Sequence, residues 1–128
     1  ARGALPNVTT SVLALAFSPD GGALAQLGRD GFLRLWRLGD KPGAAEEVWK
    51  ARLGRGPRAT IAFSPDGKRI AAATLAQVPV FATADGAEAF RLDRSSDEGQ
   101  AQHAAFGPDG KLLVLGSGGS TGRVEVWD

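Results

Sequence analysis

Short apolar runs separated by turn sequences recur along the whole chain. In three places an apolar run ends at a Phe and leads into Pro-Asp-Gly, and these segments span Leu15 to Gly21, Ile61 to Gly67, and Ala104 to Gly110. Pro presets φ for a turn, Asp accepts hydrogen bonds from its own backbone, and Gly tolerates a left-handed conformation. Each segment therefore predicts a strand that ends in a tight turn.

The similarity between the three segments extends beyond the turn. A second apolar run follows each turn and predicts a hairpin, at Ala23 to Leu27, Arg69 to Thr74 and Lys111 to Leu115. Third strands with a matching aromatic residue follow at Phe32 to Leu38, Val78 to Phe81 and Arg123 to Trp127. More polar fourth strands are expected at Glu47 to Leu53 and Ala87 to Leu92, as is common at the outer edge of a sheet.

This repetition predicts an all-β protein of three four-stranded antiparallel units with almost no helix. The inner strands are expected near residues 11 to 17, 58 to 63 and 101 to 106. Side chains that recur at a fixed phase are expected to be buried between neighbouring units, namely Phe17, Phe63, Phe106, Trp36, Phe81 and Trp127.

Four strands per unit and a strand that ends in Trp-Asp resemble the WD-repeat β-propeller family, whose blades have about 40–45 residues. The third unit ends Val124-Glu125-Val126-Trp127-Asp128, the first has Leu33-Arg34-Leu35-Trp36-Arg37, and the second has Val78-Pro79-Val80-Phe81-Ala82. The resemblance implies that residues 1–128 are three blades of a partial propeller. Its parts are an outer strand of a preceding blade at 1–5, blades at 11–53 and 58–92, and a blade without its outer strand at 101–128.

The chain departs from the family at one feature of the blade. In the family a His before the first strand joins an Asp, a Ser or Thr, and the Trp in a buried hydrogen-bonded set. Val8, Gly54 and Asp97 occupy the His positions, and only Asp30 keeps the Asp. We therefore expect these blades to depend on apolar packing, and the many alanine residues would fit a bacterial sequence.

Closed propellers have about 4–8 blades, so three blades do not complete a ring. Either they belong to a longer propeller, which we favour, or copies of the chain assemble to close one. The remaining blades or a second copy are therefore expected partners. Three blades alone would expose apolar faces and an unpaired strand edge, so the isolated chain is expected to associate.

Charge and composition exclude several classes of function. Fifteen basic and fourteen acidic residues leave a net charge of +1, which does not favour nucleic acid as a partner. The chain has no cysteine, so disulfides and thiolate metal sites are excluded. We find neither a membrane-spanning apolar run nor a signal peptide, and expect a soluble protein with no membrane partner, the cytoplasm being favoured.

Few residues suggest chemistry. The single histidine, His103, lies in a predicted inner strand, where it would be a solvated residue or a ligand of the central channel. The stretch from Gly116 to Gly122 is glycine-rich but precedes a strand, so we interpret it as a long hairpin loop and not as a phosphate loop. The turn carboxylates share one structural role. No catalytic residue, metal site or cofactor is expected.

Arginines gather where loops between strands two and three or between successive blades are expected. Arg29 lies in the first such loop, and Arg52, Arg55 and Arg58 precede the second blade. In the family these loops share one face that binds proteins or peptides, so we take Arg29, Arg55, Arg58 and His103 as candidate binding residues. The resemblance implies a non-catalytic protein-interaction scaffold. The alternative is the propeller part of a larger enzyme or of a small-ligand-binding protein.

Overall fold

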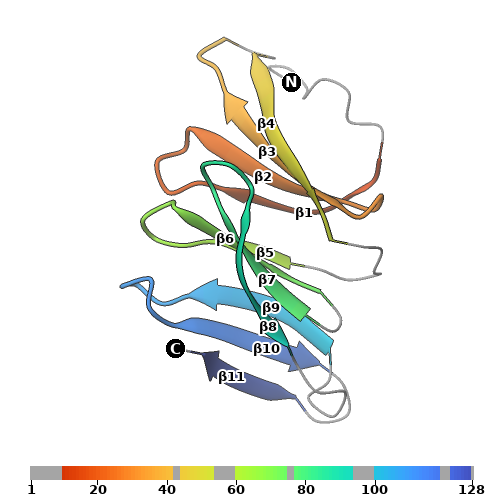
Figure 1. Cartoon of the computed structure of the whole chain (residues 1–128), viewed down its shortest axis with the longest axis vertical. Coiled ribbons are helices and arrows are strands. Elements are labelled where there is room, and N and C mark those ends of the chain that lie inside the picture. Colours follow the sequence, from red (N-terminus) through yellow and green to blue (C-terminus); the bar gives the residue numbers. More distant parts are fainter. Residues whose placement is uncertain are drawn as a thin grey trace.

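The computed structural model describes residues 10–41, 44–53, 60–74, 77–93, 100–118 and 122–127. The regular secondary structure within these residues consists of strands alone. The strands form three antiparallel sheets of four, four and three strands (Figure 1). The predicted all-β class with repeated antiparallel sheets is confirmed. The described residues contain no helix with the length and apolar character needed to cross a membrane.

Each sheet is a meander in which strands adjacent in sequence pair with one another. The first sheet consists of β1 (Val12–Phe17), β2 (Ala23–Gly28), β3 (Phe32–Leu38) and β4 (Ala45–Arg52). The second consists of β5 (Thr60–Phe63), β6 (Arg69–Ala73), β7 (Gln77–Ala82) and β8 (Glu88–Asp93). The third consists of β9 (Gln100–Phe106), β10 (Leu113–Gly118) and β11 (Arg123–Trp127).

Each of these strands overlaps a predicted one, with ends shifted by a few residues. The largest shift is at the end of β10, which extends to Gly118 where Leu115 was predicted. The prediction of a long loop from Gly116 to Gly122 is wrong for its first three residues, because Gly116 to Gly118 belong to β10, which pairs antiparallel with β11. Residues 119–121 lie outside the described residues. Residues 1–5, expected to form an outer strand, lie outside the described residues.

The turns after β1, β5 and β9 have the predicted local chemistry. Gly21, Gly67 and Gly110 adopt positive φ angles of 73°, 73° and 72°. In the first turn Asp20 Oδ1 accepts hydrogen bonds from Ser18 Oγ at 2.6 Å and from the Gly22 N–H at 2.9 Å. The second turn repeats these two bonds with the same lengths at Asp66. The turn sequence therefore specifies its own geometry.

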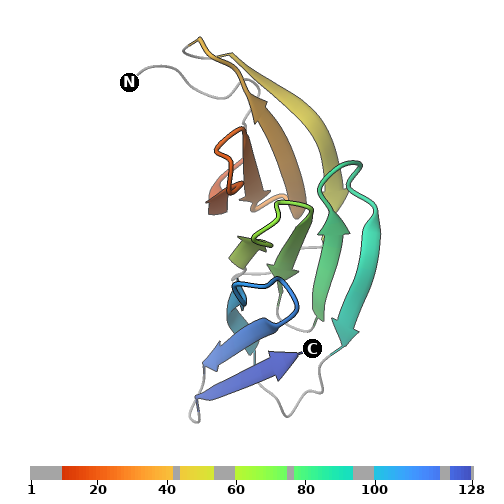
Figure 2. The same cartoon turned by 90° about the vertical axis from the view of Figure 1, so that its left-hand side faces the viewer.

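The three sheets stack face to face in a curved array (Figure 2). The first strands β1, β5 and β9 lie on the concave side, and the last strands β4 and β8 lie on the convex side (Figure 2). One apolar core fills the space between the first and second sheets, and a second core fills the space between the second and third. Small side chains, including Ala25 and Ala71, are fully buried in these cores.

The six recurring aromatic residues differ in their burial. Trp36 and Phe81 are buried, as predicted. Phe63, Phe106 and Trp127 are half-buried. The prediction for Phe17 is wrong, because this side chain is 65% exposed. No other described sheet packs against the face of the first sheet that carries Phe17, whereas the faces that carry Phe63 and Phe106 contact a neighbouring sheet.

Candidate functional site

The buried Trp36 in the first sheet has a polar partner. Its indole Nε1–H donates a hydrogen bond to Gln26 Oε1 at 2.9 Å, and both side chains are buried. Apolar packing is expected from the sequence in place of the family's hydrogen-bonded set, so this buried polar contact was not predicted. Gln26 lies on β2, the strand that pairs with β3, so a residue of the adjacent strand satisfies the indole without any histidine.

The connection between β2 and β3 is a tightly bonded turn that holds Arg29. The Arg29 N–H donates to the Ser11 carbonyl oxygen at 2.8 Å, and the Asp30 N–H donates to Thr10 Oγ1 at 3.1 Å. Gly31 adopts a φ of 87°, which allows the chain to enter β3. The backbone of Arg29 is thereby fixed while its side chain is exposed.

Asp30 forms an ion pair with Arg34 of β3. Its Oδ2 atom accepts a hydrogen bond from Arg34 Nη2 at 2.6 Å, and this contact is the main cause that lowers the pKa of the Asp30 carboxyl. The Arg34 guanidinium and the Lys50 ammonium also lie over the Phe32 ring, at 5.4 and 5.0 Å from its centroid. The Asp30 carboxylate is therefore committed to Arg34.

Among the described residues, three exposed cations lie at this end of the first sheet. We call this end the loop edge and define it by Arg29, Lys50 and Arg52. Arg52 pairs with Phe32 in the register of β3 and β4, so it lies beside the turn that carries Arg29. Of the predicted binding residues, Arg29 is found here. Arg55 and Arg58 follow Arg52 in the sequence but lie outside the described residues.

His103 lies apart from this edge, on β9 in the third sheet, with the whole second sheet between it and Arg29. It pairs with Gly116 of β10, and its side chain is exposed. Ala104 and Phe106, the alternate residues of β9, contact the second sheet. The structure therefore does not bring His103 together with the predicted arginines.

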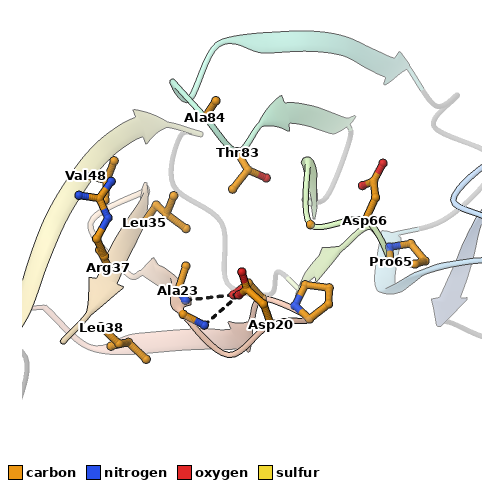
Figure 3. A pocket seen from close by; sticks show the side chains of 14 residues that line it. Asp20, Ala23, Leu35, Arg37, Leu38, Val48, Pro65, Asp66, Thr83 and Ala84 are labelled. Atoms are coloured by element: carbon orange, nitrogen blue, oxygen red, sulfur yellow. Dashed lines mark hydrogen bonds between the residues drawn. The ribbon is translucent and has the colours of Figure 1, made fainter. Parts of the chain in front are cut away.

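An open pocket of about 800 Å³ lies between the first and second sheets at the opposite edge, where the Pro-Asp-Gly turns are found (Figure 3). Asp20 and Pro19 line it from the first turn, Pro65 from the second, and Thr83 from the turn between β7 and β8. The Oγ1 atom of Thr83 is buried and has no hydrogen-bond partner in the described part of the chain. The pocket is therefore lined by both apolar and charged side chains, the charged ones being Asp20, Arg37 and Asp66.

Trp49 of β4 contacts the turn between β7 and β8, which forms one wall of this pocket. Its Nε1–H donates to the Thr83 carbonyl oxygen at 2.8 Å, and its ring lies so close to Gly86 that an added Cβ atom would be 2.6 Å from Cδ2. The rings of Trp49 and Phe81 are 6.4 Å apart. This cross-sheet contact was missed from the sequence, where Trp49 is one aromatic residue in a polar outer strand.

The acidic turn residues Asp20, Asp66 and Asp109 each accept hydrogen bonds from the backbone of their own turn. Hydrogen bonds from Ser18 and Ser64 are the main causes that lower the pKa values of Asp20 and Asp66, respectively. Within the described ranges, no three Asp, Glu or His side chains are grouped as metal ligands would be. The turns therefore account for these carboxylates.

Comparison with known proteins provides two findings. Residues 5–37 match the family model of the WD domain, G-beta repeat (WD40). The chain is also 29% identical over 126 aligned residues to the small ribosomal subunit protein RACK1 of Schizosaccharomyces pombe, an alignment that covers 93% of this chain. It spans 38% of the length of that relative. These matches show a WD40 repeat at residues 5–37 and a distant similarity of the chain to RACK1, and the three antiparallel sheets are consistent with WD40 propeller blades.

Proposed function

We propose that the chain is a non-catalytic protein-interaction module that forms part of a WD-repeat propeller and binds acidic segments of other proteins at the loop edge. Its blades in this proposal are residues 11–53, 58–92 and 101–128. The WD40 match at residues 5–37 and the distant similarity to RACK1 support an interaction role. The relative is named as a protein of the small ribosomal subunit, so that protein is a component of a larger assembly.

The observation that carries the proposal is the arrangement of Arg29, Lys50 and Arg52. These cations are exposed at one end of a rigid sheet, and the Asp30 carboxylate beside them is already bonded to Arg34. An arginine guanidinium pairs with carboxylates through two parallel hydrogen bonds, which makes it suitable for acidic partners. A fixed backbone at Arg29 reduces the entropy lost when a partner binds.

The proposal is tested with a fluorescently labelled peptide of eight glutamate residues, whose binding is followed by anisotropy at low salt. Arg29→Ala combined with Arg52→Ala is expected to weaken binding, by up to about fivefold for each exposed pair that is lost. The matched control is Lys68→Ala combined with Lys111→Ala, which removes two exposed cations that directly follow the Pro-Asp-Gly turns of the second and third sheets. Equal losses in the two double variants would contradict a specific loop edge.

A small ligand bound in the pocket between the first and second sheets is a second candidate. The pocket volume and the charged side chains of Asp20, Arg37 and Asp66 in its wall favour a small polar molecule. Ligand-observed NMR with a fragment library tests it. Ala84 is an exposed residue in the pocket wall, and Ala84→Trp would fill part of the pocket. Fragments that bind the wild type but not this variant would support this candidate. A screen without such fragments would contradict it.

A further inference from the structure

Every glycine with a positive φ in the described part of the chain follows an aspartate. The five pairs are Asp20-Gly21, Asp30-Gly31, Asp66-Gly67, Asp85-Gly86 and Asp109-Gly110. An Asp-Gly pair converts to isoaspartate more readily than other aspartate pairs, because glycine has no side chain to hinder attack by its nitrogen. The chain therefore carries five candidate sites of this modification, and their turns differ in how they hold the reacting groups.

Isoaspartate formation is an intramolecular rearrangement in which one molecule of water leaves and one is taken up. The glycine nitrogen attacks Cγ of the preceding aspartate and loses its proton, and a carboxyl oxygen leaves as water. Water then opens the resulting succinimide ring at one of its two carbonyl carbons. Opening at the main-chain carbonyl carbon leaves the peptide bond at Cγ, so Cβ becomes part of the main chain.

The attacking nitrogen is held in a hydrogen bond at each of the five pairs. The N–H groups of Gly21, Gly67 and Gly110 each donate to the carbonyl oxygen three residues earlier at 2.9 Å. Gly31 does the same at 3.0 Å, and Gly86 donates at 2.9 Å to the carbonyl oxygen four residues earlier. This bond must break before the nitrogen can lose its proton and turn towards Cγ. The reaction at any pair therefore requires its turn to open.

The aspartate carboxylates are held less equally than the nitrogens. Asp20 and Asp66 each accept two hydrogen bonds, one of them from a serine hydroxyl at 2.6 Å. Asp30 accepts two from a guanidinium, the shorter at 2.6 Å. Among the described residues, Asp85 and Asp109 accept one each, at 3.0 Å from the N–H two residues later. Because such bonds oppose the rotation that brings Cγ to the glycine nitrogen, these two carboxylates are the least restrained.

A contact between sheets restrains the turn that carries Asp85. Trp49 Nε1–H donates to the Thr83 carbonyl oxygen at 2.8 Å, and Trp49 Cδ2 would lie 2.6 Å from a Cβ atom on Gly86. Isoaspartate lengthens the main chain by one carbon atom, and a main chain packed this closely against an indole ring has little room for it. The first sheet therefore opposes the reaction at this pair.

The turn after β9 has neither restraint. Gly107 occupies the position of the serine in the other two Pro-Asp-Gly turns, so no serine hydroxyl of this turn bonds to the exposed Asp109. Among the described residues, a Cβ atom on Gly110 would meet only Pro65 Cδ, at the ordinary contact distance of 3.7 Å. We infer that Asp109-Gly110 is the preferred site of isoaspartate formation in this chain. This site lies on the third sheet and is independent of the proposed binding at the loop edge.

The test follows isoaspartate in the folded 128-residue chain during long incubation at physiological temperature and mildly acidic pH. Peptide mapping with electron-transfer dissociation quantifies the modification at each pair, because the lengthened main chain gives distinct fragments. Conversion at Asp109 is expected to be about tenfold faster than at Asp20 or Asp66, which is the order of effect of one hydrogen bond to a charged group. In urea the five pairs should react at similar rates, which assigns the difference to the folded turns.

Two variants change the serine hydroxyl in opposite directions. Gly107→Ser supplies the missing donor and should slow conversion at Asp109 about tenfold, whereas Ser64→Ala should speed conversion at Asp66 by a similar factor. The matched control is Gly107→Ala, which adds a Cβ atom without a hydroxyl group and should leave the rate at Asp109 nearly unchanged. Circular dichroism shows whether each variant is folded, and Ser64→Ala tests the hydroxyl independently if Gly107→Ser does not fold.

Three results would overturn the inference. The first is conversion in the folded chain that is equally fast at all five pairs or faster at a pair other than Asp109-Gly110. The second is an unchanged rate at the affected aspartate in folded Gly107→Ser or Ser64→Ala. The third is equal slowing by Gly107→Ser and Gly107→Ala, which would assign the control to backbone stiffness in place of the hydroxyl group.

Discussion

The strand β5, which packs against the first sheet, and the strand β1, whose residues Leu15 and Phe17 lie on a face that no other described sheet covers, have similar sequences and different surroundings. Leu15-Ala16-Phe17 on β1 corresponds to Ile61-Ala62-Phe63 on β5. Ile61 is buried in the core between the sheets, whereas Leu15 and Phe17 are mostly exposed. In both cases the apolar pattern predicts a strand with one apolar face that another sheet could cover. Whether the face is buried depends on the presence of a neighbouring sheet.

The largest expected effect compares the core aromatic residue Phe81 with the exposed Phe17. Phe81→Ala removes a buried ring packed near Trp49 and is expected to cost ~3–5 kcal/mol of unfolding free energy. Phe17→Ala in dilute chain is expected to cost less than ~1 kcal/mol. Denaturant titration of both variants measures the difference. Equal losses at low concentration would mean that Phe17 is covered within one copy.

Substitution of two turn glycines distinguishes the cost of backbone strain from the cost of a clash between sheets. Gly86 and Gly21 have nearly the same φ, at 74° and 73°, but a Cβ atom at Gly86 would meet Trp49 whereas one at Gly21 would meet nothing within 4 Å. Gly21→Ala is expected to cost ~1–2 kcal/mol from the left-handed backbone alone. Gly86→Ala adds ~1–3 kcal/mol of overpacking. Equal thermal shifts in the two variants would argue against the close contact with Trp49.

Trp36 is an exception to the comparison, because it is buried although it shares its face with exposed residues. Trp36→Phe leaves Gln26 Oε1 without its donor and is expected to cost ~1–3 kcal/mol. In the equivalent pair of the third sheet, an apolar residue, Leu115, accompanies Trp127. Adding Gln26→Leu to Trp36→Phe should therefore recover part of the loss, as measured by denaturant titration. A double variant less stable than the single one would contradict this interpretation.

The smallest expected effect concerns the Pro-Asp-Gly turns after β1 and β5, which have similar hydrogen bonds although only β5 packs against another sheet through its Ile61 face. Asp20 and Asp66 have lowered pKa values in the folded chain through equivalent hydrogen bonds from Ser18 and Ser64. A lowered folded pKa stabilises above the unfolded value of about 4, and the contribution is lost as pH falls through the folded pKa. Asp20→Asn and Asp66→Asn should both flatten the acid limb of the stability curve, and Asp66→Asn should do so slightly more, because Lys68 and Arg69 also lower the pKa of Asp66. A larger change at Asp20, measured by denaturant titration against pH, would contradict this interpretation.

The strands and turns could be predicted from the sequence because their causes are local. Alternation of apolar residues and the Pro-Asp-Gly turn act within a few residues, and the structure has strands and left-handed glycines at those places. The candidate site was predictable only in part. Arg29 is exposed at the expected turn, but the isolation of His103 on the third sheet depends on how the sheets stack.

By itself, the sequence determined the all-β class, the repeated meander and the conformation of each Pro-Asp-Gly turn, since neighbouring residues supply all the necessary bonds. The tertiary structure decided which of the equivalent apolar faces is covered, and it paired Trp36 with Gln26 and Trp49 with the turn at Thr83. Those contacts join residues on different strands or sheets. Their free energy depends on distances that arise only when the sheets pack, so no local pattern encodes them.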